Sequence, residues 1–444
     1  MIDKTSYFES SSIPPAQVAT APEPTSTSHW SPTQLRPVPA FYPLEKSSRL
    51  IQDESATDVA LRLTECLRTL SIQALYDNKA ATASLFTAEN VEMHLSLWLK
   101  AATPSNATCG VVVELQRRKG DSIAFHRYSR SILDAAVGDL DLDTMPNDVW
   151  DDAVYSKKVQ RLLSMELDNQ HNQEHENAII AIEIAHGLLM KDRMDARQLG
   201  LESLCLLTDP KKTGYITAVL TSHVVLLGTT LGVRIPGVDD EGDSAIVMDE
   251  GPFQEIREAI LSLVQFSRIG DDDETDVDDI VTMPDSDHMM LLHNLALAVL
   301  ANALEVIENP ERFDDEPEQT HDSKPRARLR TASSSDVTNE FLQQTEDFSK
   351  KEILSTLIAE LGKAHTKPHN AALSAKCLGS MCRASDEAKE RAKELGAKTV
   401  VSTALDVGAR THLKLETECK KVSKVLQLTT TATSTTTGTT DSLE

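Results

Sequence analysis

The spacing of apolar residues changes along the chain and divides it into segments of different structure. Residues 1–50 are rich in Ser, Thr and Pro without apolar periodicity, which is typical of a disordered tail. Residues 55–70 have apolar positions every three or four residues and predict a helix with Ser55 as its cap. Residues 91–99 alternate apolar and polar side chains, as a half-buried strand does. Residues 51–142 are therefore predicted to form a small α+β domain, with further strands at 71–75, 83–86 and 111–116.

The end of this segment resembles part of a known domain family. The stretch GVVVELQRRKGDSIAFHRYSRSIL covers Gly110–Leu133 and predicts a strand, a turn at Gly120, a strand over 122–125 and a last helix over 128–137. In this order of elements it resembles the kinase-associated C-terminal domain, and residues 51–142 follow the same order more loosely. The resemblance implies a basic surface that binds anionic phospholipid headgroups. The sequence shows no kinase domain ahead of it, unlike the usual family setting.

An acidic hinge separates this segment from residues 155–310, which predict helices throughout. Residues 178–190 carry two neighbouring apolar stripes, which predict a helix buried from two sides: Ile179, Ile182, His186 and Leu189 form one, and Ile180, Ile184 and Leu188 the other. The helix predicted at 195–207 has Asp195 as its cap and directs four leucines inward, at Leu199, Leu201, Leu204 and Leu207. Further helices are predicted at 215–227, 253–266 and 288–308.

The C-terminal part carries the clearest internal repeat. Residues 311–345 have the composition of a disordered linker, and the Thr/Ser-rich residues 429–444 that of a disordered tail. Between them, residues 346–428 predict two helix pairs, and Ser355-Thr356 of the first pair recurs as Ser402-Thr403 in the second. The Ala/Leu-rich helix NAALSAKCLGSM and the Gly-Ala that opens the next repeat resemble armadillo repeats over about 350–428, and less closely over 178–228. The fold class expected is mainly α, an α-α superhelix of armadillo-like repeats with a small N-terminal α+β domain.

The repeat pattern also predicts which side chains are buried. Eight positions of the C-terminal helices are expected in the core: Leu357, Leu361, Leu373, Leu378, Val400, Leu405, Val422 and Val425. Aromatic residues make up only 4% of the chain, so these cores are built from Ala and Leu, which permit close helix packing.

Charge and cysteine usage narrow the classes of partner and compartment. The formal net charge of −25 repels phosphate backbones, so nucleic acid is not expected as a partner. The six cysteines are widely spaced and predict reduced thiols. Neither a secretory signal nor an uninterrupted membrane-spanning stretch is visible. We therefore expect a soluble protein with a cytoplasmic address, and a nuclear address stays open.

Two sequence patterns suggest metal binding, and each has a simpler interpretation. His171-Asn-Gln-Glu174-His175 matches the HxxEH motif of zinc peptidases, yet its polar flanks indicate a solvated helix start. Residues 239–250 place acids as a calcium loop does, but Ser244 stands where the turn needs Gly. The acid-rich insert 239–287 favours a solvated loop, with docking of a basic partner as the alternative. No metal or other cofactor is expected, and no catalytic residues are assigned.

A basic island and a kinase motif are the remaining candidate sites. The candidate contacts for lipid or another anion are Arg117, Lys119, Arg127 and Arg130. Ser333 follows Arg328 and Arg330 at the spacing that basophilic kinases prefer, so it is a candidate phosphorylation site. The function expected is a non-catalytic scaffold or adaptor that binds another protein through its helical repeats, with a basic protein as one alternative. The alternatives are a peripheral membrane adaptor that binds anionic lipid weakly, and a metal-dependent hydrolase that depends on the HxxEH motif alone.

Overall fold

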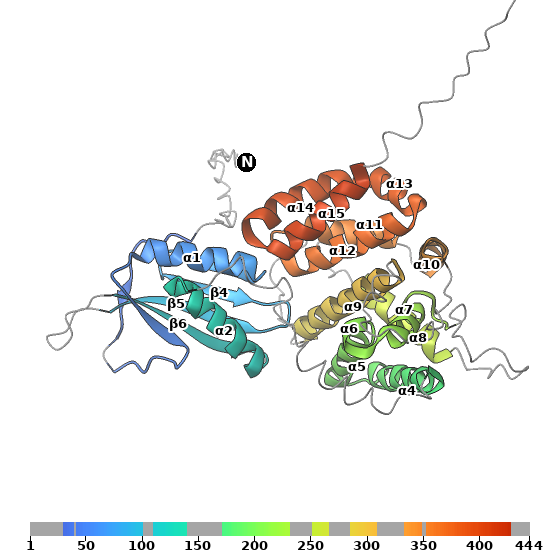
Figure 1. Ribbon diagram of the computed structural model, residues 1–444, viewed down its shortest axis with the longest axis horizontal. Helices are drawn as coiled ribbons and strands as arrows, with labels where there is room; N and C mark the ends of the chain where they lie inside the picture. Colours follow the sequence, from blue (N-terminus) through green and yellow to red (C-terminus); the bar gives the residue numbers. More distant parts are fainter. Residues whose placement is uncertain are drawn as a thin grey trace, which may run out of the picture.

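The computed structural model describes residues 30–39, 41–100, 110–139, 171–230, 251–265, 285–308, 333–348 and 352–427 of the 444-residue chain. These residues form a small α+β domain in the N-terminal part and a larger body of helices (Figure 1). The fold is mostly helical with a small N-terminal sheet, which confirms the coarse fold class predicted from the sequence.

The N-terminal domain is a sheet with two helices on one face (Figure 1). Antiparallel strands lie in the order β2-β6-β5-β4-β3, and β1 pairs with β5 in parallel. The strands are β1 Arg36–Pro37, β2 Ser48–Gln52, β3 Gln73–Asp77, β4 Thr82–Phe86, β5 Glu92–Lys100 and β6 Gly110–Lys119. The helices are α1 Ala56–Thr69 and α2 Ser122–Val137. Ser55 caps α1 by accepting a hydrogen bond from the Asp58 amide at 3.1 Å, as predicted.

The side of the sheet that faces the helices holds the domain core. Met93, Leu95 and Leu97 alternate along β5 and are fully buried, as the alternating sequence predicts. They pack with buried residues of both helices, among them Leu63 and Ile132. The apolar alternation thus fixes which face of β5 points inward.

The opposite face is organised by a buried carboxylate on β6. Glu114 is fully buried and accepts three hydrogen bonds, from the Glu45 amide at 2.9 Å, the Trp98 indole at 3.0 Å and the Tyr42 hydroxyl at 3.2 Å. Burying a carboxylate is costly unless its oxygens are paired, and these three donors meet that need. Glu114 therefore attaches the segment before β2 to the sheet.

Two predictions for this domain are wrong. Residues 30–39 and 41–50 are ordered rather than part of a disordered tail, because Trp30 is fully buried and stacks on Tyr76 at 5.5 Å and because β1 and β2 join the sheet. Residues 122–125 open α2 instead of forming a strand. Asp121 caps that helix by accepting a hydrogen bond from the Ala124 amide at 2.7 Å, so the chain turns into a helix directly after Gly120.

The helical body contains a series of helices joined by segments outside the described residues or by short turns. Their bounds are α4 His171–Leu189, α5 Met194–Leu207, α6 Pro210–Thr213, α7 Tyr215–Leu227, α8 Gly251–Val264, α9 Asp285–Glu308, α10 Ser334–Phe348, α11 Ile353–Gly362, α12 Pro368–Ala384, α13 Asp386–Glu394, α14 Ala397–Thr411 and α15 Leu413–Gln427. The prediction for 215–227 matches α7 at both ends, where Gly214 and Gly228 adopt positive φ.

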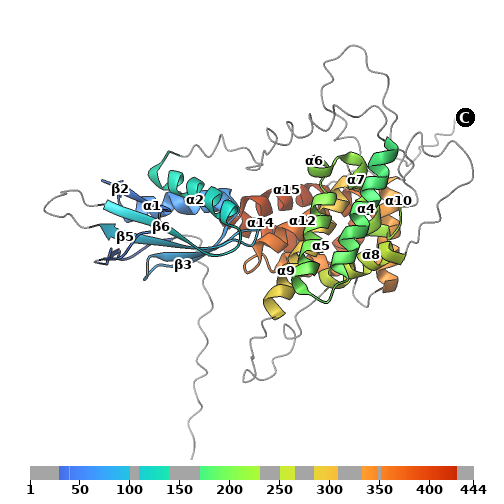
Figure 2. The ribbon, with the colours of Figure 1, turned by 90° about the horizontal axis from the view of Figure 1, so that it is seen from below.

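The helices pack side by side to form one body. Helices α4 and α5 form an antiparallel hairpin at one edge, and α9 packs between that part and α12 (Figures 1 and 2). In the C-terminal part, α11 packs on α14 and α12 packs on α15, with the short α13 between the two pairs. One continuous apolar core runs through these helices from Ala178 to Leu426.

The structure corrects three further predictions in this body. Residues 334–345 of the predicted linker belong to α10, because Val337, Phe341 and Thr345 are buried at helical spacing. The helix predicted with Asp195 as its cap begins one residue earlier, after Arg193, and the cap makes no side-chain hydrogen bond. Of the eight predicted core positions, four are fully buried and four are half-buried: Leu373, Val400, Leu405 and Val425.

The residues of α9 from His288 to Glu308 are long and apolar enough to cross a membrane. Most of that stretch is buried in the protein, against α5, α7, α8 and α12. The core helix of a soluble protein passes the same test of length and composition.

Candidate interaction site

The α4–α5 hairpin carries several exposed apolar side chains. Half of the large apolar side chains that are exposed in the described residues lie on this one hairpin: Ile180, Ile184, Met190, Leu199 and Leu206. Ile184 is 60% exposed and Leu206 is 53% exposed, although both belong to helices whose other faces are fully buried. We call these five residues the hairpin face.

The helical positions of these residues explain why they point outward. On α4, Ile179, Ile182 and Leu189 enter the core, and Ile180 and Ile184 lie on the opposite side of the helix. The prediction that α4 is buried from two sides is therefore wrong, because Ile180 and Ile184 of the second stripe are exposed and only Leu188 is half-buried. On α5, Leu201, Leu204 and Leu207 point inward as predicted, and the prediction for Leu199 is wrong because it is 51% exposed.

Close contact between the two helices holds the hairpin face in shape. Gly200 of α5 lies against the backbone of α4, so that a Cβ atom there would come within 2.8 Å of the Leu189 nitrogen and 3.0 Å of the Ala185 oxygen. A residue without a side chain is needed at this crossing. His186 of α4 also contacts Glu255 of α8 at 2.7 Å, which ties the hairpin to the next helix.

The charges around the hairpin face are mixed, with acids in excess on α4. Glu176 and Glu183 are exposed on the same side of α4 as Ile180 and Ile184. At the turn, Arg193 donates two hydrogen bonds to Asp195, and the pair lowers the pKa of this exposed carboxyl. The face therefore combines apolar side chains with acidic flanks.

The residues of the predicted basic island lie around the turn from β6 into α2. Arg117 and Lys119 are exposed at the end of β6, and Arg127 and Arg130 are exposed on α2. The Arg117 guanidinium donates to the Gly120 carbonyl at 2.6 Å.

Arg127 of this island forms an ion pair with Glu89 at 3.5 Å, so its charge is partly neutralised within its own domain. Burial raises the pKa of the Glu89 carboxyl, while Arg127 and Lys414 act in the opposite direction. The island is thus an exposed group of cations whose charge is partly neutralised by local partners.

Ser333, the candidate phosphorylation site, stands directly before α10. Its side chain is exposed, and its carbonyl accepts a hydrogen bond from the Val337 amide at 3.0 Å. A phosphate on Ser333 would lie at the N-terminus of α10, where the helix dipole favours negative charge. Arg328 and Arg330, which complete the kinase motif, lie outside the described residues.

The two predicted metal-binding patterns lie largely outside the described residues. The backbone of His171 to His175 opens α4, but the side chains of His171 and Glu174 are outside the described set, as is the whole of 239–250. Within the described ranges, no three side chains of His, Cys, Asp or Glu gather as metal ligands would. The hairpin face remains the most distinct feature among the candidate sites.

Comparison with known proteins adds no relative to this picture. No family model, no curated protein and no solved structure matches the chain.

Proposed function

We propose that this protein is a non-catalytic scaffold or adaptor that binds another protein through the hairpin face. The observation that carries the proposal is the exposure of Ile180 and Ile184 on α4 together with that of Leu199 and Leu206 on α5. Exposed apolar surface costs free energy in water, and a concentration of it on one supersecondary unit is typical of sites that a partner covers.

The chemistry of the hairpin face favours one kind of partner, an amphipathic helix with basic flanks. Ile180 and Ile184 are one helical turn apart, and Leu199 and Leu206 are two turns apart, which suits the apolar ridge of a helix laid across them. Glu176 and Glu183 beside this ridge would attract Lys or Arg on the partner. The chain's net charge of −25 would add long-range attraction for the same partner.

We further propose that the helical body is an armadillo-like superhelix, with the α4–α5 hairpin near one end of the array. The packing of α11 on α14 and of α12 on α15 supports this, because equivalent helices of successive repeats contact each other in such arrays. The short α13 corresponds to the short first helix of a repeat. For the N-terminal domain, the strand and final helix at Gly110–Leu133 support the kinase-associated resemblance, although 122–125 is helical.

Paired affinity captures from the native cell test the partner surface. The double variant Ile180→Glu and Ile184→Glu should lose the proteins that the unchanged chain captures, by at least tenfold, because two apolar contacts are lost and two carboxylates are added. Both side chains are exposed, so the double variant should keep its melting temperature.

Leu61→Glu is the matched control, since Leu61 is equally exposed but lies on α1 of the other domain. It should leave capture unchanged. Equal capture by all three chains would contradict the proposed surface. A drop in stability of the double variant alone would show that another segment of the same chain covers the hairpin face.

A second candidate function is weak binding of anionic lipid through the basic island. The exposure of Arg117, Lys119, Arg127 and Arg130 favours it. Each cation near a headgroup contributes about 1 kcal/mol at low salt, so four give at most ~4 kcal/mol before repulsion from the acidic chain. Vesicles that contain phosphatidylserine should float more of the unchanged chain than of the Arg117→Ala, Lys119→Ala variant. Equal flotation at low salt would leave the island as solvated surface.

A further inference from the structure

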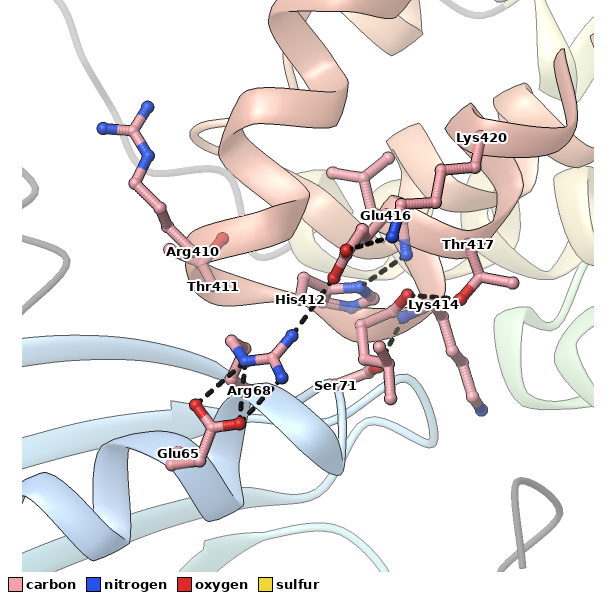
Figure 3. Close-up of polar contacts among 12 residues, drawn as sticks. Glu65, Arg68, Ser71, Arg410, Thr411, His412, Lys414, Glu416, Thr417 and Lys420 are labelled. Carbon is pink, nitrogen blue, oxygen red and sulfur yellow. Dashed lines mark hydrogen bonds and ion pairs between the residues drawn. The ribbon is translucent and has the colours of Figure 1, made fainter. Parts of the chain in front are cut away.

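The N-terminal domain meets the C-terminal helices at a polar junction (Figure 3). The Arg68 guanidinium near the end of α1 donates to the Glu416 carboxylate of α15 at 3.1 Å. The backbone amide of Lys414 donates to the Ser71 hydroxyl at 2.9 Å. The junction therefore joins parts of the chain that are more than 300 residues apart in the sequence.

The junction does not join the two apolar cores. Within the described residues, the buried apolar side chains of the N-terminal domain and those of the helical body form separate clusters. Two further contacts across the junction are also polar. The Gln73 side-chain amide donates to the Thr366 carbonyl at 3.0 Å, and His369 Nε2 lies 3.0 Å from the Phe86 carbonyl oxygen. Domains that meet through polar contacts in place of a shared apolar core are expected to move relative to each other.

Ser71 has a backbone conformation that is unusual for a residue with a side chain. It follows α1 directly after Leu70, and its φ of 56° lies in the left-handed region, where glycine is the common residue after a helix. Its own amide donates to the Arg68 carbonyl at 3.0 Å and so closes α1. Glycine would close the helix equally well, but it has no hydroxyl to accept from the Lys414 amide.

The Lys414 amide needs this partner because it lies in the first turn of α15. Amides of the first turn of a helix have no acceptor inside the helix. The Leu415 amide donates to His412 Nδ1 at 3.1 Å, so its acceptor belongs to the helical body. The acceptor of the Lys414 amide is the buried Ser71 hydroxyl, so part of the N-terminal cap of α15 comes from the other domain.

The charged groups of the junction also have partners inside their own domains. Arg68 donates to Glu65 of α1 at 2.7 Å, and Glu416 accepts from Lys420 of α15 at 2.5 Å. Figure 3 shows these residues as a row in which Arg68 and Glu416 are the middle pair. Separation of the domains would therefore leave neither charge without a counterion.

We propose that the N-terminal domain is a detachable module, and that the chain exchanges between a docked form, held by the Ser71 cap and the Arg68–Glu416 ion pair, and a separated form in which both domains stay folded. Each domain keeps its own apolar core in the separated form. That form exposes the turn after α1 and the N-terminus of α15, which cover each other in the docked form. The module is independent of the hairpin face.

Native-state hydrogen exchange of the full chain tests the separation. Separation breaks the hydrogen bond of the Lys414 amide and leaves that of the Leu415 amide, so Lys414 should exchange at least about tenfold faster after correction for intrinsic rates. Exchange at Lys414 should also depend weakly on urea, because separation exposes much less surface than unfolding does. The amide of Val422, a fully buried residue of the same helix, should depend strongly on urea.

Two results of this experiment would overturn the separation. Equal exchange at Lys414 and Leu415 would show fraying of the first turn of α15, since fraying frees both amides. The same urea dependence at Lys414 as at Val422 would show that the junction opens only when the whole chain unfolds.

Charge reversal tests the ion pair with the same readout. Arg68→Glu and Glu416→Arg each place like charges at the junction, and each should speed Lys414 exchange by about tenfold. The two changes combined should bring the rate back toward that of the unchanged chain, because the charges are complementary again. Glu390→Arg, which removes an ion pair with Lys393 on α13, is the control and should leave the rate unchanged. A combined variant as fast as the single variants would refute the role of the ion pair.

Small-angle scattering shows whether the domains move apart. Ser71→Gly removes the hydroxyl and suits the left-handed backbone at this position. Combined with Glu416→Arg, it should weaken docking by about 100-fold, since each lost contact contributes about tenfold. The radius of gyration should then rise while the circular dichroism of the helices stays unchanged. A chain that stays compact, or one that expands and loses helical signal, would contradict the proposal.

Discussion

Replacing Gly200 by alanine should loosen the α4–α5 hairpin, and the same change at Gly187 should not. The new Cβ at position 200 would come 2.8 Å from the Leu189 nitrogen and 3.0 Å from the Ala185 oxygen. Both neighbours are backbone atoms of α4, which cannot rotate away as the end of a side chain can. At Gly187 of α4, a Cβ would meet no atom within 4 Å.

The two changes share one favourable contribution and differ in one unfavourable one. Alanine stabilises a helix interior by roughly 0.5–1 kcal/mol relative to glycine. Overpacking against a fixed backbone costs about 1–3 kcal/mol. Gly187→Ala should therefore raise the free energy of unfolding by up to ~1 kcal/mol, and Gly200→Ala should lower it by ~0–2 kcal/mol, so the two variants differ by roughly 1–3 kcal/mol.

Urea titrations followed by circular dichroism measure this difference, with the two variants and the unchanged chain run together. Hydrogen exchange in α4 and α5 locates the effect, since exchange should rise near Ala185 and Leu189 only in Gly200→Ala. A Gly200→Ala chain as stable as Gly187→Ala would refute the close crossing of α4 and α5. The shape of the hairpin face would then need another explanation.

Two further predictions concern buried side chains. Leu378→Asp should cost at least ~4 kcal/mol of stability in the same titration, because Leu378 is fully buried on α12. As the control, Leu206→Asp on the hairpin face should cost under ~0.5 kcal/mol. Similar costs for both variants would contradict the burial of Leu378. Glu114→Ala should cost roughly 3 kcal/mol and speed exchange of the Glu45 amide, since three hydrogen bonds to a charged acceptor are lost. Glu114→Gln should cost less, and slow exchange at Glu45 in both variants would show that Glu114 does not hold this segment.

The sequence predicts local structure well where local signals are strong. Ser55 as the cap of α1 and the ends of α7 follow from residues within or beside each helix. The alternation in β5 likewise predicts that Met93, Leu95 and Leu97 face the core. Each of these predictions depends on contacts between residues that are near in the sequence.

Contacts between distant residues could not be predicted in the same way. The order of the segment before β2 depends on Trp30 stacking on Tyr76 and on donors that reach Glu114 from about 70 residues away. No spacing pattern predicts the contact between His369 and His412, whose ring nitrogens lie 3.0 Å apart although the residues are 43 positions apart in the sequence. Two histidines in a helical region show no sign that their rings meet at a domain junction.

The hairpin face illustrates a different limit. The two apolar stripes of α4 are visible in the sequence, and they predict that both sides are covered. A pattern of apolar residues indicates burial without indicating whether the covering surface belongs to the same chain. Ile180 and Ile184 are exposed in the structure. Under the proposed function, a partner protein and not this chain buries them.

Photo-crosslinking at position 184 in the native cell tests the partner surface most directly. A benzophenone amino acid replaces Ile184 in one chain and, as the control, Leu61 in another. Position 184 should crosslink to a separate protein through a segment with apolar and basic residues, and position 61 should not. Crosslinks from position 184 only to this chain itself, or the same products from both positions, would contradict the account.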